Sequence, residues 1–255
     1  MNLKKNIIMK KNIIIVATFV LVALCQLTCE KLVAQNSNNK TGFGFRAGRN
    51  HADLNYSSGL YDMYTHKDHW QNQYGFFLNC HVSKHFAIRP EIDYNGRGVS
   101  LKYEDITYKM DAKYVDLRLP FILSFAPNSI INPYIFVAPE FCLARDGVIT
   151  YKSNQTGKIS CDISDANLSQ YDVAVIGGLG IEFPLNIGRF RMSLAAEGGY
   201  SIGFFDTFSK DEINCESTLL NPSPYILPPE SSRNNKGIEI AVSISIPFSS
   251  FESNE

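Results

Sequence analysis

Residues 75–98 constrain the fold more than any other part of the chain. They read GFFLNCHVSKHFAIRPEIDYNGRG, two runs of alternating apolar and polar residues separated only by Ser83, Lys84 and His85. Two alternating runs joined by so short a link predict a β-hairpin. In the second run the apolar positions are Phe86, Ile88, Pro90, Ile92 and Tyr94, and the positions between them carry Arg89, Glu91, Asp93 and Asn95. One face of this strand is therefore apolar and the other is charged.

Several charges in a row on one strand face, repeated in later strands, favour a barrel with lipid outside and a polar, self-paired interior. The alternative with the same strand count is a soluble, lipocalin-like barrel, which would turn the charges outward and the apolar residues inward. The two readings differ in the side to which Arg89, Glu91 and Asp93 point. We expect the first, an all-β, eight-stranded antiparallel transmembrane up-and-down barrel.

The eight expected strands are separated by connections that alternate between long and short, as in outer-membrane barrels. The strands are residues 41–50, the two runs within 75–98, and residues 114–125, 134–144, 171–183, 189–203 and 237–248. The long connections are expected to be loops at residues 53–73, 100–113, 145–170 and 204–235. Prolines in the last of these predict that it contains no regular sheet.

The N-terminus predicts a cleavable signal peptide over residues 1–34. Lysines precede an apolar run at residues 13–24, and Leu32, Val33 and Ala34 precede Gln35. The apolar run is short for a spanning helix. A lipoprotein is the other alternative, because Cys25 and Cys29 lie nearby, but Leu24 and Thr28 occupy the places where a small residue is expected. Residues 35–255 then form a single barrel domain, and we expect it in the outer membrane.

Charge argues against a nucleic-acid partner. The whole chain has a formal net charge of −1, and residues 1–34 contain five lysines but only one acidic residue. The mature chain is therefore more acidic than the whole, whereas nucleic-acid binding requires a basic surface.

Several motifs in order resemble the PorT-type outer-membrane β-barrel family of Gram-negative bacteria. They are VSKHFAIRPEI, YVDLRLPFIL, NPYIFVAPE and VIGGLGIEF, which together extend over most of the mature chain. The resemblance implies a small outer-membrane barrel. The founding member of that family is tied to a protein secretion and gliding machinery, so the resemblance also implies such a role as one alternative for this chain.

Strand alternation places twelve ionisable side chains in the lumen, and all the bases among them are arginines. A guanidinium group can bind two carboxylates at once, which suits a nearly dry interior. Eight strands enclose a space that side chains can fill, so we expect a closed lumen; an ion or proton path along the acidic excess is the alternative. The residues are Arg46, Arg89, Glu91, Asp93, Asp116, Arg118, Glu140, Asp172, Glu182, Arg191, Glu197 and Glu239.

Other motifs give no catalytic, cofactor or metal site. His66 and His69 have H-x-x-H spacing, but without a further ligand at fixed spacing they are expected to be surface histidines. The run Gly177-Gly178-Leu179-Gly180 lacks the strand-to-helix context of a phosphate loop, so we interpret it as small residues on a narrow barrel wall. Cys161 and Cys215 lie in long loops, where a disulfide is one alternative and unpaired thiols the other.

The expected function is a non-enzymatic structural or surface-interaction role through the long extracellular loops, with outer-membrane lipid and a protein as partners. Loops on rigid scaffolds commonly carry function. The secretion machinery is the main alternative. A rim-active lipid enzyme is the weakest, because His51 and His81 have no G-x-S-x-G motif or acid at a defined spacing. The sequence does not specify the partner or the oligomeric state.

Overall fold

The computed structural model describes residues 41–55, 65–103, 105–154, 157–162, 171–187, 190–206, 212–213, 225–226 and 234–250. The predicted signal peptide, with Cys25 and Cys29, lies outside these residues. No helix among the described residues is long and apolar enough to cross a membrane.

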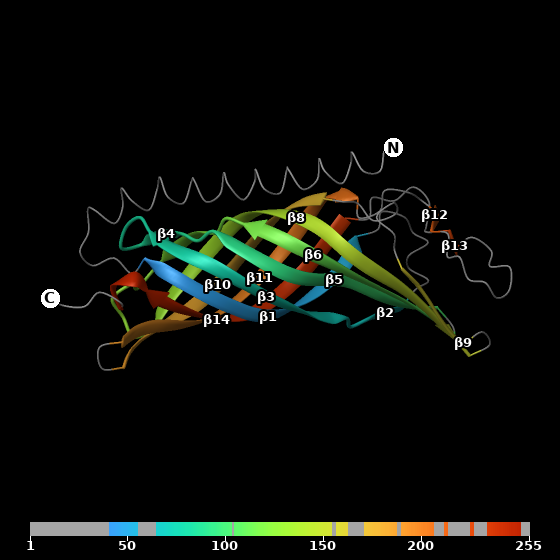
Figure 1. Cartoon of the computed structure of the whole chain (residues 1–255), viewed down its shortest axis with the longest axis horizontal. Coiled ribbons are helices and arrows are strands. Elements are labelled where there is room, and N and C mark those ends of the chain that lie inside the picture. The colour runs from blue at the N-terminus through green and yellow to red at the C-terminus, as the bar shows by residue number, and fades with distance from the viewer. Residues whose placement is uncertain are drawn as a thin grey trace, which may run out of the picture.

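The described strands close into an antiparallel barrel with eight wall positions (Figure 1). Two of these positions are occupied by pairs of shorter strands. β1 pairs with β14 and β8 with β10, and these pairings complete the ring. The wall consists of β1 (Gly42–Asn55), β3 (Trp70–His81), β4 (Phe86–Ile88) with β5 (Glu91–Tyr103), β6 (Ile106–Arg118) with β7 (Phe121–Ser124), β8 (Asn132–Ser153), β10 (Tyr171–Ile187), β11 (Phe190–Asp206) and β14 (Asn234–Pro247).

The facing of the side chains excludes the lipocalin-like alternative. Arg89, Glu91 and Asp93 are at most 4% exposed, whereas Phe76 and Ile92 on the same sheet are 65% and 46% exposed. Apolar side chains therefore cover the outside and charged ones occupy the lumen, as a barrel in lipid requires. The predicted eight-stranded transmembrane barrel is confirmed.

Proline divides two adjacent wall strands. A proline has no N–H to donate to the ladder, and Pro90 separates β4 from β5 as Pro120 separates β6 from β7. The sheet is bridged there by hydrogen bonds from the Arg89 N–H to the Pro120 carbonyl at 2.9 Å and from the Leu119 N–H to the Pro139 carbonyl at 3.2 Å. The wall remains continuous across both breaks.

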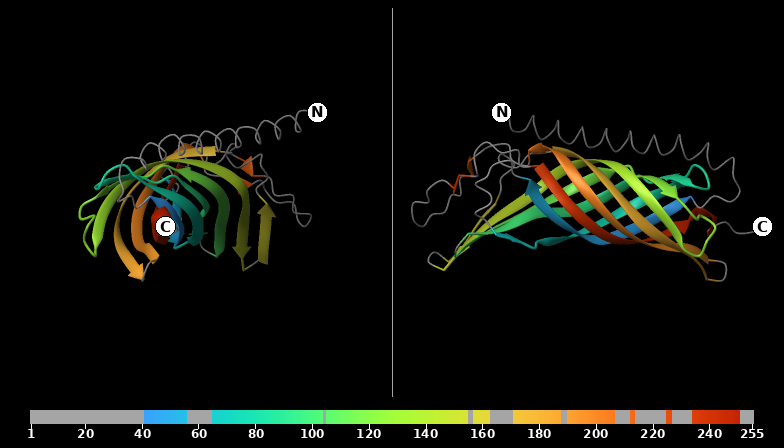
Figure 2. Two further views of the ribbon diagram at one scale, coloured as in Figure 1. Left: turned by 60° about the vertical axis from the view of Figure 1, so that its left-hand side comes forward. Right: turned by 180° about the vertical axis from the view of Figure 1, so that it is seen from behind.

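The two ends of the barrel differ. One end carries the short connections 82–85 and 125–131 together with the start of β1 and the end of β14, followed by the short 3-10 helix η2 (Phe248–Ser250). Short turns and chain ends mark the periplasmic end of such barrels. At the other end β5, β6 and β8 extend into a sheet with β2 (Thr65–Lys67) and β9 (Gly157–Asp162), and β9 lies near its far tip (Figures 1 and 2).

This extracellular sheet corrects the predicted loops. Within residues 100–113, predicted to be a loop, β5 continues to Tyr103 and β6 begins at Ile106. Within residues 145–170, also predicted to be a loop, the end of β8 and β9 form a hairpin. The prediction that residues 204–235 contain no regular sheet was also wrong, since β12 (Glu212–Ile213) pairs with β13 (Tyr225–Ile226). Beyond the bilayer the outward face meets water, so the apolar side chains of the extension, such as Met110 and Ala112 of β6, are buried on the inner face instead.

Candidate functional site in the barrel lumen

Arginine and carboxylate side chains from six wall positions meet in the middle of the lumen. Every side chain in their ion pairs is at most 5% exposed. The pairs form three linked rings in which guanidinium groups and carboxylates alternate. We call this set the lumen charge network: Arg46, Arg89, Arg97, Arg118, Glu91, Asp93, Asp116, Glu140, Glu197 and Glu239.

The first ring joins Arg46 and Arg89 through two glutamates. Arg46 Nη1 lies 2.9 Å from Glu91 Oε2, and its Nη2 lies 3.5 Å from Glu197 Oε2. Arg89 contacts the other oxygens of the same carboxylates, with Nε 2.6 Å from Glu91 Oε1 and Nη1 2.6 Å from Glu197 Oε1. Each carboxylate is thus held by two guanidinium groups from different strands.

The second ring joins Arg46 to Arg118. Arg46 contacts Asp93 at 3.2 Å and Glu239 at 3.0 Å. Arg118 Nη1 lies 3.2 Å from Asp93 Oδ2 and 2.9 Å from Glu239 Oε2. The ring therefore connects β1, β5, β6 and β14 across the lumen.

The third ring contains an arginine that the sequence analysis did not assign to the lumen. Arg97 Nη2 lies 2.9 Å from both Asp116 Oδ2 and Glu140 Oε1. Arg118 Nε contacts the same Glu140 oxygen at 2.7 Å, and Arg118 Nη2 closes the ring 4.0 Å from Asp116 Oδ2. Arg97 shares the odd-numbered face of β5 with Glu91 and Asp93, so alternation continued two residues beyond Asn95 would assign it to the lumen.

This arrangement leaves no need for a metal in the third ring. Asp116, Glu140 and Cys142 bring one possible ligand atom each to within 4.8 Å of one another. The Arg97 guanidinium already supplies positive charge to both carboxylates. The cluster therefore has the chemistry of an internal ion pair.

Three predicted lumen residues stand apart from the network. Asp172 accepts hydrogen bonds from Asn235 Nδ2 and the Phe205 N–H, each at 3.1 Å. Glu182 accepts one from Asn132 Nδ2 at 3.0 Å, near the periplasmic end. Arg191 is exposed where β11 begins, and its backbone contacts Ser250.

Glycines on the wall make room for the lumen side chains. A Cβ built on Gly75 would lie 1.5 Å from Asp93 Oδ1, and one on Gly178 would lie 2.5 Å from the Phe136 ring. A Cβ on Gly180 would meet the Tyr134 ring at 2.4 Å. These contacts agree with the interpretation of the glycine run of β10 as small residues on a narrow wall.

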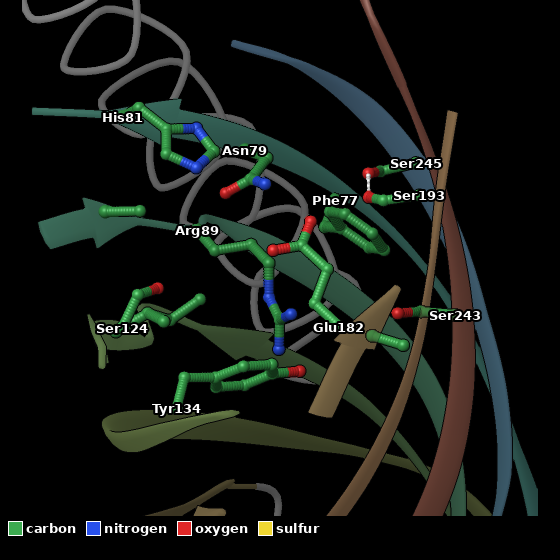
Figure 3. A pocket seen from close by; sticks show the side chains of 13 residues that line it. Phe77, Asn79, His81, Arg89, Ser124, Tyr134, Glu182, Ser193, Ser243 and Ser245 are labelled. Atoms are coloured by element: carbon green, nitrogen blue, oxygen red, sulfur yellow. Dashed lines mark hydrogen bonds between the residues drawn. The ribbon is translucent and has the colours of Figure 1, made fainter. Parts of the chain in front are cut away.

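A small polar pocket lies below the network, towards the periplasm (Figure 3). Arg89, Tyr134 and Glu182 line it together with Asn79 and His81 of β3. On its far wall the hydroxyls of Ser193 and Ser245 are 2.7 Å apart and hydrogen-bonded to each other.

His69, in the first long connection, and His51, on β1, have different acidic partners. His69 Nε2 lies 2.5 Å from Asp111 Oδ1, and His51 Nε2 lies 3.4 Å from Asp68 Oδ1. The side chain of His66 lies outside the described part of the chain, as do those of Cys161 and Cys215. That His66 and His69 are surface histidines therefore remains a prediction. Whether Cys161 and Cys215 form a disulfide or remain unpaired thiols also stays open.

Comparisons with solved structures give distant likenesses. Neisserial surface protein A is 12% identical over 81% of this chain and 97% of that chain, with a TM-score of 0.39. Ail of Yersinia pestis is 8% identical over 80% and 99%, with a TM-score of 0.36. OprG of Pseudomonas aeruginosa is 13% identical over 82% and 96%, with a TM-score of 0.41. No curated protein matches the chain in sequence.

A family model gives a stronger result. The model described as "Outer membrane protein beta-barrel domain" matches residues 33–209, more than two thirds of the chain. The match agrees with the closed ring of strands and with the apolar outer face, and it places the protein in the outer membrane. The chain therefore belongs to the outer membrane protein beta-barrel domain family.

Proposed function

We propose that this protein is a non-enzymatic outer-membrane barrel that is closed to ions and acts through its extracellular surface, by binding a protein partner. The observation that carries the proposal is the lumen charge network, because its three rings span the barrel and leave every member at most 5% exposed. With the lumen filled, the extracellular sheet of β2, β5, β6, β8 and β9 is a described surface that projects from the barrel and is open to a partner.

The closed lumen is tested by planar-bilayer recording on the purified barrel. We expect no steady open state, because side chains fill the interior of an eight-stranded barrel. A wide porin inserted in the same bilayer is the positive control. Reproducible nanosiemens steps from this protein would contradict the closed lumen and favour the ion-path alternative.

The surface role is tested by covalent crosslinking on intact cells. One variant replaces the β8–β9 hairpin beyond Gly147 with a tight turn, a second shortens residues 207–233, and a matched variant carries Lys84→Ala in a periplasmic turn. We expect a crosslinked partner to be lost with one of the extracellular variants and kept with Lys84→Ala. The opposite pattern would refute the surface role.

A role in a secretion machinery is the second candidate, and the resemblance to the PorT-type family supports it. Such a component needs periplasmic contacts, and the described periplasmic connections are short, at residues 82–85 and 125–131. We therefore favour the surface role. A secretion defect on deletion of the gene, together with crosslinks that survive both extracellular truncations, would reverse this preference.

A further inference from the structure

A row of polar and basic residues lies on the outer face of the barrel just above its lipid-facing tyrosines. Tyr74 and Tyr94 face each other on β3 and β5 and are each 47% exposed. Aromatic residues at this position mark the boundary between lipid tails and headgroups. Side chains one step further along the same faces therefore lie among the headgroups of the outer leaflet.

The residues at that next step form what we call the cationic row: Arg49, Asn72, Gly96 and Lys113. Arg49 is paired with Asn72, and Gly96 with Lys113. Each lies two residues beyond a lipid-facing position on its own strand. Arg49 and Asn72 are exposed, Lys113 is partly exposed, and Gly96 is covered by the side chains of Gln71 and Lys113. The row crosses four adjacent strands, which are spaced about 4.8 Å apart, so its two cations are anchored about 14 Å apart.

The two cations of the row have no ion-pair partner among the described residues. The Arg49 guanidinium lies over the Trp70 ring, 5.9 Å from its centroid, and contacts the Trp70 carbonyl at 3.5 Å. The Lys113 ammonium donates to Gln71 Oε1. Lys109, by contrast, is 3.0 Å from Asp111 and is neutralised by it. Arg49 and Lys113 therefore keep their charge available to a ligand.

Local geometry holds both cations against the wall. Because Gly96 has no side chain, the Lys113 ammonium lies over it, 2.8 Å from where a Cβ would be. Gln71, which accepts from Lys113, is fixed by its amide, which donates to Asp111 Oδ1 at 2.8 Å and to the Arg97 carbonyl at 3.2 Å. Fixing a cation in advance lowers the entropy lost on binding.

The row is not repeated on β11, where the outward positions Tyr200, Ile202 and Phe204 stay apolar and are 48%, 49% and 57% exposed. On the neighbouring β14 a single basic residue, Lys236, shares the outward face, opposite Ile202.

We propose that the cationic row binds the phosphate groups of a phosphorylated glycolipid of the outer leaflet, of the lipid A type. Basic side chains beside an anionic membrane surface attract its headgroups, and the row continues the lipid-facing surface directly. Two cations anchored on β1 and β6 fit a lipid with two phosphates, whereas a single free phosphate reaches only one of them. Asn72 between them can donate to a phosphate or a sugar hydroxyl.

The chain carries its own reporter for this site, since Trp70 is its single tryptophan. The test titrates the purified full-length protein, in zwitterionic detergent micelles, with diphosphoryl lipid A while Trp70 emission is recorded. We expect a saturable change in emission. Lys113→Ala leaves the Arg49–Trp70 contact in place and should weaken binding about fivefold, the contribution of one basic side chain near an anionic surface.

Arg49→Ala alters the surroundings of Trp70, so its effect is read by retention of lipid A in native mass spectrometry. The double variant Arg49→Ala, Lys113→Ala should lose about 25-fold. Lys158→Ala, at the exposed tip of the β8–β9 hairpin, is the matched control and should bind as the parent does. Heat-modifiable migration confirms that each variant is folded.

Three further titrations identify the source of the anion. Monophosphoryl lipid A should bind more weakly than the diphosphoryl form. Inorganic phosphate and phosphatidylglycerol micelles should give little change. Equal binding by parent and Lys113→Ala, or an equal response to phosphatidylglycerol or inorganic phosphate, would overturn the proposal.

Discussion

Arg118 holds more of the lumen carboxylates than a single ion pair would suggest. It contacts Asp93, Glu140 and Glu239 within 3.2 Å, and none of these side chains is more than 4% exposed. A carboxylate that loses its partner in such surroundings cannot regain water. The contribution of a single lumen arginine to stability therefore depends on how many buried carboxylates lose their cation when it is removed.

The first prediction concerns Arg118→Ala. Breaking a buried pair by removing one partner costs about 3–5 kcal/mol, and we expect the free energy of unfolding to fall by about that amount. Urea unfolding in detergent, followed by heat-modifiable migration, measures it. Lys67→Ala, on the exposed strand β2, should shift the midpoint little, and an equal shift in both variants would contradict the prediction.

The second prediction concerns pH and Asp111, which pairs with Gly98 on the extracellular side of the lipid-facing Tyr94. Burial disfavours its ionised form, but hydrogen bonds from His69 and Lys109 more than offset this and lower its pKa to about 2. Because this is below the ordinary value of 3.8, ionised Asp111 stabilises the fold above about pH 4. That contribution is lost as the pH falls through 2.

Emission from Trp70, which follows His69 in sequence, should therefore change in an acid step whose midpoint is near pH 2. Asp111→Asn should remove the step, and Asp146→Asn, an exposed carboxylate on β8, should leave it in place. A step that persists in Asp111→Asn would assign the transition to another group.

At the scale of one element, the two faces of β10 test the filled lumen. Gly177 faces outward, and a Cβ built on it would lie 4.0 Å from its nearest neighbour, the backbone oxygen of Phe136. Gly178 faces inward, where a Cβ would lie 2.4 Å from the Gly198 carbonyl and 2.5 Å from the Phe136 ring. Adjacent residues of one type thus have opposite tolerance for a methyl group.

The third prediction follows from this contrast. Gly178→Ala should destabilise the barrel by about 1–3 kcal/mol through overpacking, and Gly177→Ala should change its stability by less than about 0.5 kcal/mol. The midpoint of heat-modifiable migration compares them. Equal effects would mean that the lumen around Phe136 is not tightly packed.

The strands inside the bilayer could be predicted from the sequence, whereas their extensions could not. In β6 the outward positions Val115 and Leu117 are apolar because they meet lipid, and they alternate visibly with Asp116 and Arg118. Further out, Lys109, Asp111 and Lys113 occupy the same face, whereas Met110 and Ala112 on the other face are fully buried. The alternation therefore continues, but its apolar side now faces inward, because the outward side has left the lipid and meets water.

The ion-pair partners within the lumen could not be predicted from the sequence either. Alternation assigns Arg191 and Glu197 to the same face of β11. They differ in their depth along the barrel axis: Arg191 is exposed at the start of β11, whereas Glu197 is buried in the lumen charge network. Depth depends on register and tilt, which require the whole ring.

At the scale of the molecule, the membrane barrel and the extracellular sheet are largely independent. β8 pairs with β10 from Asn132 to Leu143, and its residues from Gly147 onward pair only with β6 and β9 among the described strands. A register irregularity at Arg145, opposite Lys113 and Tyr114, separates the two parts.

The fourth prediction is that the β8–β9 hairpin beyond Gly147 can be replaced by a tight turn without loss of the barrel. None of its residues belongs to the lumen charge network, so the variant should still show heat-modifiable migration. Complete loss of the folded band would show that the hairpin is needed for the barrel to form. The comparison is a variant in which the periplasmic connection at residues 125–131 is replaced by a tight turn, with heat-modifiable migration measured in the same way.

The ion pair between Arg46 and Glu239 links the first wall strand to the last. The two residues are 193 positions apart in sequence, and their side chains meet at 3.0 Å where β1 and β14 close the ring. A nascent barrel that lacks β14 has an arginine without one of its carboxylates, and such a group must keep its water. Water can therefore leave the lumen only after β14 has paired with β1. The Arg46–Glu239 ion pair thus makes strand closure precede dehydration of the lumen during insertion.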